Sequence, residues 1–343
     1  MSVHRVTEYR TGRYREERRY REYADLTVQE KLSQIAEFTA IVYDRNGVKI
    51  GQLSSINERA YMILDFALGE IGSGNFKLTL LREPPFLIDY SFKIVVYLFQ
   101  SIVPWYAGYV TELPRLGSTD RRKVYSGVGY YNQLQGCVIL NRVYAAEKVE
   151  DIVKHLVQNE VTPQSDIIYN AGKIQTTAYT VQDQQFFLVD AKKVMGELAR
   201  LAGNWVFGVD EYQEFFFKPR DTGLQTAAIK AVGKHMDSFV PQGDATKIAN
   251  RLYIKCGKTT GGSNYIVTLN DATSQGIYGI RSKVLTAPSV LDIADATQWG
   301  TEKLTQYAYP TVRSTIKNVD ITLLKERISA DGKARILLTE VPA

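Results

Sequence analysis

The sequence predicts a mainly β protein with an α+β insert, in which two strand-rich blocks flank a small α/β module. Short runs of alternating apolar and polar residues, separated by turn residues, fill both ends of the chain. Two helix-period runs lie between them. Tyrosine, which favours strands and half-exposed contact surfaces, occurs 22 times. We place an N-terminal arm at 1–35, the first block at 36–145, the module at 146–235 and the second block at 236–343.

The composition is that of an ordinary globular protein. The chain has 343 residues, of which 45% are hydrophobic and 23% charged, and this length suits two or three domains. The longest apolar stretch, Phe92–Val110, contains Lys93, Gln100 and Pro104, so we expect no membrane-spanning segment. The N-terminus is rich in arginine with no apolar run behind it, so we expect no secretory signal.

The basic charge is concentrated in the arm. The formal net charge is +5, and residues 1–23 contribute +3 of it through seven arginines and four glutamates. A dedicated DNA-binding protein would carry its basic excess on a folded domain, so that role is not expected. The arm is either a frayed terminus or a segment that becomes ordered on a neighbouring subunit. In the second case the contact residues would be Arg10, Arg13, Tyr14, Arg15, Arg18, Arg19, Tyr20 and Arg21.

The first block shows about seven strands joined by short turns. They are predicted at 38–43, 48–53, 61–68, 76–80, 92–99, 105–113 and 123–131. Asn46-Gly47 lies between the first two and is a strong hairpin signal. The run at 92–99 is apolar on both faces, so we expect it to be covered on both sides. Many short strands with tight turns favour an antiparallel barrel or sandwich.

The middle module combines two helices with a hairpin. Residues 149–157 carry one apolar stripe at helical spacing. A second helix is predicted at 191–202, with Asp190 as its N-cap and Gly203 beyond its end. A Phe-rich hairpin follows, with strands at 205–209 and 213–218.

The strand pattern returns in the second block. One strand is predicted to begin at residue 250, and four more are predicted at 265–269, 276–281, 315–324 and 334–341. Ser289 followed by Asp292 resembles a capping box, so a helix is expected to begin there and to end before Pro310.

No catalytic, cofactor-binding or metal-ligating residues are predicted. His4, His155 and His235 are the only histidines, and none lies at metal-ligand spacing from a second ligand. Cys137 and Cys256 are expected to be reduced, although a single bridge stays open, and Cys137 is expected to be a buried small hydrophobic residue. We therefore expect a protein that is not an enzyme and uses no cofactor.

Seven short segments occur in a recognisable order. The first five are Trp105–Val110 with Val124–Tyr130, Val149–Val157, and Leu198–Trp205 leading into Glu214–Pro219. The last two are Ala249–Ile254 and Gly276–Arg281. Together they resemble the baseplate hub proteins of tailed bacteriophages and related contractile particles, and the tail-tip hubs of long-tailed phages. The likeness covers about residues 36–325, so the arm lies outside it.

This resemblance implies two tail-tube-like antiparallel β-barrel domains in each chain. A homotrimer would present six barrels as a pseudo-sixfold ring, joining a sixfold tail tube to a threefold spike or tip. The implied partners are the tube protein, the spike or tip protein, the tape-measure protein and surrounding baseplate proteins, with DNA only as passing cargo. The implied location is the virion tail, assembled in the host cytoplasm. The alternatives are a tail-associated hydrolase, for which no part of the chain is left over, and a glycan- or receptor-binding tail protein, whose aromatic face would use Trp105, Tyr125, Tyr130 and Tyr131.

Overall fold

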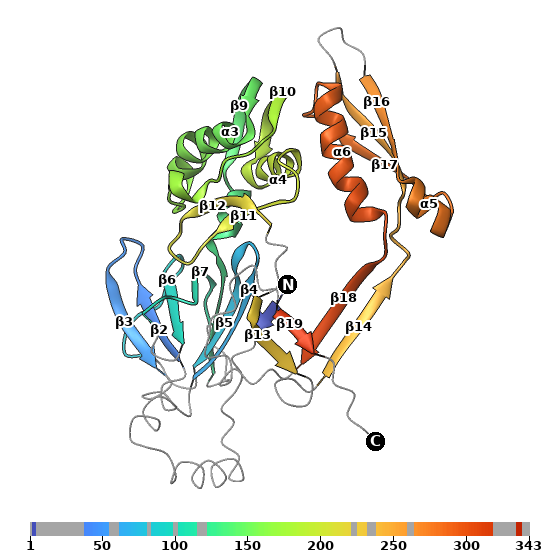
Figure 1. The fold of residues 1–343 in the computed structure, drawn as a ribbon. Helices are drawn as coiled ribbons and strands as arrows, with labels where there is room; N and C mark the ends of the chain where they lie inside the picture. The colour runs from blue at the N-terminus through green and yellow to red at the C-terminus, as the bar shows by residue number, and fades with distance from the viewer. Residues whose placement is uncertain are drawn as a thin grey trace, which may run out of the picture.

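The fold is mainly β, as expected, and the helices of the described residues lie in the middle and last parts of the chain (Figure 1). The structure, a computed structural model, describes residues 2–4, 38–54, 62–80, 84–98, 102–114, 122–220, 225–231, 238–258, 264–317 and 334–337. None of the helices in these ranges is long and apolar enough to cross a bilayer.

The first block is a single antiparallel ladder. Its strands are β1 (Ser2–His4), β2 (Phe38–Tyr43), β3 (Lys49–Ser54), β4 (Met62–Gly69), β5 (Gly72–Leu80), β6 (Lys93–Leu98), β7 (Tyr106–Glu112) and β8 (Lys123–Gly129). They pair in the order β1-β4-β5-β8-β7-β6-β2-β3, and each neighbouring pair is antiparallel. The seven predicted strands correspond to β2–β8.

The hairpin signal is confirmed in atomic detail. The Asp44 carboxylate accepts hydrogen bonds from the backbone N–H groups of Asn46 and Val48, each at 2.8 Å. Gly47 has a φ of +77°, a left-handed conformation that glycine adopts without strain. The turn therefore fixes the register of β2 against β3.

One face of every strand from β2 to β8 contributes to a common core. Tyr106 lies at its centre, is fully buried, and donates a hydrogen bond from its hydroxyl to the Gly74 carbonyl at 2.8 Å. Its ring packs against Phe66 and Phe76 at centroid distances of 5.4 and 5.7 Å. A sheet whose strands all point inward at one core has the curvature needed to enclose it.

The middle module contains both predicted helices and the predicted hairpin. The helices are α3 (Val149–Leu156), which continues as a π-helical turn over Val157–Val161, and α4 (Ala191–Leu201). The hairpin is β11 (Trp205–Val209) with β12 (Phe215–Pro219). Asp190 caps α4 by accepting from the Lys193 N–H at 2.9 Å, and Gly203 follows the helix with a φ of +104°.

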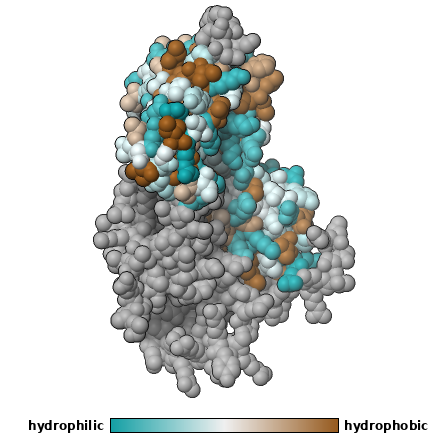
Figure 2. All heavy atoms as spheres, turned by 90° about the vertical axis from the view of Figure 1, so that its right-hand side faces the viewer, coloured by the Kyte–Doolittle hydropathy of each residue, from teal (hydrophilic) through white to brown (hydrophobic). Residues whose placement is uncertain are grey.

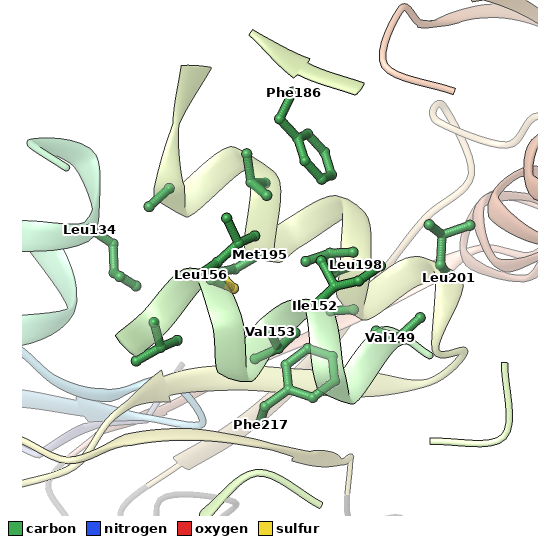
Figure 3. Close-up of a cluster of buried hydrophobic side chains, with 14 of the residues drawn as sticks. Leu134, Val149, Ile152, Val153, Leu156, Phe186, Met195, Leu198, Leu201 and Phe217 are labelled. Atoms are coloured by element: carbon green, nitrogen blue, oxygen red, sulfur yellow. The ribbon is translucent and has the colours of Figure 1, made fainter. Parts of the chain in front are cut away.

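A long two-stranded ribbon in this module is absent from the sequence prediction. It pairs β9 (Val138–Lys148) with β10 (Thr180–Asp190) in antiparallel register. Figure 3 shows α3 and α4 packed side by side, with Phe186 of β10 on one side and Phe217 of β12 on the other. The remaining short turns are η1 (Tyr130–Gln135), η3 (Thr162–Gln164) and η4 (Ala171–Lys173).

The last block is divided among three small sheets. In one, β15 (Arg251–Lys258) lies between β16 (Asn264–Asn270), which is antiparallel to it, and β17 (Ser282–Ala287), which is parallel. In the others, β14 (Ser238–Asp244) pairs antiparallel with β18 (Thr311–Lys317), and β13 (Gln225–Ala231) pairs parallel with β19 (Ala334–Leu337). The helices are α5 (Ala272–Tyr278) and α6 (Ile293–Tyr307). The parallel pairs differ from the all-antiparallel block that was expected.

The predicted strand at 276–281 is wrong, because residues 276–278 form the end of α5 and residues 279–281 belong to neither a helix nor a strand. Asp271 caps that helix by accepting from the Ser274 N–H at 2.8 Å, and Gly279 follows it with a φ of +71°. Local capping therefore outweighs the β propensity of the intervening apolar residues. The later helix is confirmed as α6, but its N-cap is Asp292 and not Ser289.

The buried side chains form two cores. The first contains only residues of the first block. The second joins α3, α4, β11 and β12 to buried residues of β15 and α6, among them Leu252, Ile254, Ala296 and Trp299. The middle module and the last block therefore share one core.

Candidate assembly surfaces and the joints between blocks

The predicted assembly residues of the arm cannot be placed. Arg10, Arg13, Tyr14, Arg15, Arg18, Arg19, Tyr20 and Arg21 lie outside the described residues. Only Ser2–His4 of the arm is described, as the strand β1 that pairs with Phe66–Leu68 of β4. Its role in assembly stays a prediction.

The described cysteine and histidine side chains are either buried or hydrogen-bonded within the chain. Cys137 and Cys256 are both buried and unbridged, as expected for Cys137, and burial raises the pKa of each thiol. His155 is exposed, and its Nδ1 is hydrogen-bonded to the Tyr144 hydroxyl at 2.8 Å. The described ranges contain no group of three or more His, Cys, Asp or Glu side chains that could hold a metal ion.

The aromatic residues proposed for a glycan-binding face are packed inside the molecule. Trp105, Tyr125, Tyr130 and Tyr131 are each at most 9% exposed. A sugar ring stacks on an exposed aromatic face, so these four side chains cannot form such a platform. That part of the alternative is wrong, because the aromatics fill cores: Tyr131, for example, packs on Phe207 at a centroid distance of 5.6 Å.

The first joint connects the first block to the middle module through β6 and β7. Ile94 and Val96 of β6 belong to the first core, whereas Val95 between them belongs to the second. The expected two-sided burial of this strand is therefore confirmed. Backbone pairing adds a direct link, since Val209 of β11 lies opposite Gly72 of β5 in parallel register.

Polar contacts line the same joint. Lys93 of β6 donates to the Gln213 side chain at the tip of the β11–β12 hairpin. Burial lowers the pKa of Lys93, and the nearby Asp166 carboxylate opposes that shift. Asp166 is itself held by Gln133, whose amide group donates to the carboxylate at 2.7 Å. The hairpin tip is thus fixed against the first ladder by neutral and charged partners.

The second joint connects the middle module to the last block around Asp295. This α6 residue is fully buried, and its carboxylate accepts from the backbone N–H groups of Gln182 and Asp183 on β10, at 3.0–3.1 Å. The Tyr179 hydroxyl donates to it at 2.7 Å. Burial raises the pKa of Asp295, while these three donors oppose the shift. One carboxylate therefore ties helix α6 to strand β10.

Backbone and side-chain contacts extend this joint on both sides of Asp295. The Gln185 N–H donates to the Ser289 carbonyl at 3.2 Å, and the Leu291 N–H to the Asp183 carbonyl at 3.3 Å. The segment 289–291 therefore continues the sheet of β10. On α4, half-buried Glu197 accepts from the Ser289 hydroxyl, and desolvation raises the pKa of this carboxyl group.

Two exposed apolar surfaces lie outside these joints. The ribbon face, on β9 and β10, exposes Leu140, Val143, Phe187 and Leu188. The sheet face is the side of β16-β15-β17 that points away from α6, where Ile266 and Val284 are more than half exposed. The upper part of Figure 2 shows hydrophobic side chains scattered over the region of this sheet and α5. Exposed apolar areas on β-sheets are common sites of protein contact.

Sequence reasoning missed both the joints and these surfaces. The apolar residues at 138–143 and 186–189 could have suggested strands, but neither run alternates apolar with polar residues. No local pattern marks Asp295 as the partner of β10, which is more than 100 residues away.

Searches against protein-family models and curated proteins found no match. Solved structures do match. The 43 kDa tail protein of prophage MuSo2 from Shewanella oneidensis is 14% identical, with a TM-score of 0.58, covering 88% of this chain and 89% of that one. The tail protein from Neisseria meningitidis MC58 is 12% identical, with a TM-score of 0.57 and coverages of 88% and 87%.

A third match is the prophage tail protein gp18 from Listeria monocytogenes EGD-e. It is 12% identical, with a TM-score of 0.53, covering 81% of this chain and 80% of that one. At such low identities the likeness concerns architecture, and it extends over most of each chain. The chain therefore has the fold of bacteriophage tail proteins.

Proposed function

We propose that the protein is a structural hub of a phage or phage-like tail. Three copies would form a pseudo-sixfold ring that joins a sixfold tail tube to a threefold spike or tip and lets the genome pass. The observation that carries the proposal is the tail-protein fold, shared over most of the chain with three solved tail proteins, two of them from prophages. The protein would act in the virion tail after assembly in the host cytoplasm, by its shape and without catalysis.

Two features of the molecule support a geometric role. The β2–β8 ladder surrounds one core, as a tube-type barrel would. The pairs β14–β18 and β13–β19 are the candidates for a second barrel, because the β15–β17 sheet contributes its buried face to the middle core instead. The two joints would hold these barrels at a fixed spacing, which a symmetry adaptor requires.

A closed ring needs two unlike surfaces on each chain, one contacting the other on the next copy. The ribbon face and the sheet face are candidates because both are apolar and exposed. The remaining proposed partners are the tube protein, the spike or tip protein, the tape-measure protein and surrounding baseplate proteins, with DNA as cargo.

The test is the mass of the assembled particle, measured by light scattering alone and with the tube protein of the same phage. We expect a trimer of the 38.7 kDa chain. Phe187→Asp and Val284→Asp, one on each surface, should reduce the trimer fraction. Leu87→Asp is the matched control, since Leu87 is 71% exposed but lies on neither surface. A chain that stays monomeric with its tube protein would contradict the proposal.

A further inference from the structure

Three cationic side chains gather where α4, α6 and β17 meet. The Lys283 and Lys303 ammonium groups lie 3.9 and 5.6 Å from the centroid of the same ring, that of Tyr307. The Arg200 guanidinium lies 5.8 Å from the ring of Trp299. Trp299, Lys303 and Tyr307 are spaced four residues apart on α6, so they occupy one face of that helix.

This cation cluster makes no ion pair within the described part of the chain, although the Glu197 carboxylate on the same helix attracts Arg200. No ion pair there involves Arg200, Lys283 or Lys303, and the hydrogen bond of the Lys303 ammonium is to the neutral Gln306 amide at 3.3 Å. Of the nearby carboxyl groups, Glu197 accepts from Ser289, and burial raises the pKa of Glu302. Neither is bound to a lysine of the cluster.

A second and independent observation concerns Trp299. Its indole N–H is buried and has no hydrogen-bond acceptor among the described residues. Buried donors are nearly always paired, so an unpaired one calls for a partner that the chain itself does not supply. Because Arg200 lies over the ring of Trp299, this unpaired donor belongs to a side chain that adjoins the three cations.

The electrostatic cost of this arrangement falls on Lys303. Burial, together with repulsion from Arg200 and Lys283, lowers its pKa to about 8. The charged groups that act on it are Arg200 from α4 and Lys283 from β17, and its ammonium group lies over the Tyr307 ring of α6 itself. An anion next to Lys303 would relieve the repulsion and favour the charged ammonium form.

We propose that Arg200, Lys283, Lys303 and the Trp299 indole form a binding site for an oxyanion, either a phosphate or a carboxylate group. Oxyanions supply several acceptors and a negative charge, which matches three cations without an ion-pair partner and one unpaired donor. The competing account is that the lysine stems merely cover the Tyr307 ring and keep their heads in water. The proposal does not depend on the proposed tail function.

The test uses the full chain in a buffer free of both ions, titrated separately with inorganic phosphate and with acetate. The readouts are the melting temperature and the indole ¹H–¹⁵N signal of Trp299, assigned with Trp299→Phe. We expect a saturable shift of both signals. Response to phosphate alone, to acetate alone, or to both would each support the site and would identify the group that it takes.

Variants separate the site from general charge effects. Lys303→Gln and Lys283→Gln should each weaken the binding by about tenfold or more, the loss of one charge-assisted hydrogen bond. Lys154→Gln is the control, because this lysine lies on α3 in an ion pair with Asp151. Equal responses in Lys303→Gln and the unmodified chain, or no response to either anion, would overturn the proposal.

Discussion

The first and last blocks are both rich in strands, yet they are stabilised in different ways. The first block encloses a core made only of its own side chains. The buried residues of β15 and α6 instead belong to the cluster that contains α3 and α4. The last block thus depends on the middle module for much of its apolar burial, and the comparison shows that similar strand content does not imply similar independence.

The largest predicted losses of stability come from substitutions that create a cavity, one in each core. Leu78→Ala on β5 and Leu198→Ala on α4 both truncate fully buried leucines, so each should cost about 2–5 kcal/mol of unfolding free energy. Hydrogen exchange should distinguish them. Leu78→Ala should increase exchange in β2–β8 only, whereas Leu198→Ala should do so in α3, α4, β15 and α6 together. Unchanged exchange in β15 and α6 would mean that the last block is independent after all.

The second prediction concerns the carboxylate that joins α6 to β10. Asp295→Ala leaves the partly buried donors of Gln182, Asp183 and Tyr179 without their acceptor. The expected cost is about 1–3 kcal/mol, measured by urea unfolding, with faster exchange of the β10 amides. Asp271→Ala, which removes only the cap of α5, should cost about 1 kcal/mol and leave β10 unaffected. Equal β10 exchange in both variants would argue against Asp295 as the link.

A smaller effect should distinguish Lys303 of the cation cluster from Lys93 of the first joint. The pKa of Lys303 falls from 10.5 to about 8 on folding, so unfolding takes up a proton between these pH values and stability rises with pH through that window. In phosphate-free buffer, Lys303→Gln should therefore stabilise the chain below pH 8, by about 0.5–1 kcal/mol after solvent screening, and the gain should vanish near pH 10.5.

Lys93 provides the contrast for this measurement. Burial lowers its pKa too, but its neighbours are Asp166 and the Gln213 amide rather than other cations. Lys93→Gln should give no comparable gain below pH 8. The measurement is thermal unfolding of both variants across pH. A similar gain in stability in both would show that burial alone, and not cation repulsion, accounts for the Lys303 effect.

The smallest effect on stability is expected from the arm. Deleting residues 5–23, which spares β1, should leave the melting temperature unchanged but weaken assembly, most clearly at raised salt, where the remaining charged contacts are screened. The measurement is the trimer fraction by light scattering at low and high ionic strength. Identical assembly with and without the segment would dismiss a role for the arm arginines and tyrosines.

Local patterns were sufficient for much of the fold. Asp44 and Gly47 specify the first hairpin, and Asp190 and Gly203 bound α4, because turns and caps depend on neighbouring residues. The same locality explains the error at 276–281, where the cap at Asp271 had more influence than strand propensity.

The joints were not predictable in this way. Asp295 looks like an ordinary residue in the first turn of a helix, and its partners at 179–183 are set by tertiary packing. Likewise, nothing near Lys303 in the sequence indicates that Arg200 and Lys283 would become its neighbours. The second barrel in the last block and the domain bounds stay predictions.

The position of strand β6 between the two cores has a further consequence. Side chains of successive residues point to opposite faces, so a slip of one position would exchange the contents of two cores at once. The isoleucine and valines at 94–96 thus determine the register of β6 as well as fill space in the two cores. A register shift of β6 that one core could accommodate would therefore still disrupt the packing of the other core. This short strand thus fixes the position of the first block relative to the middle module.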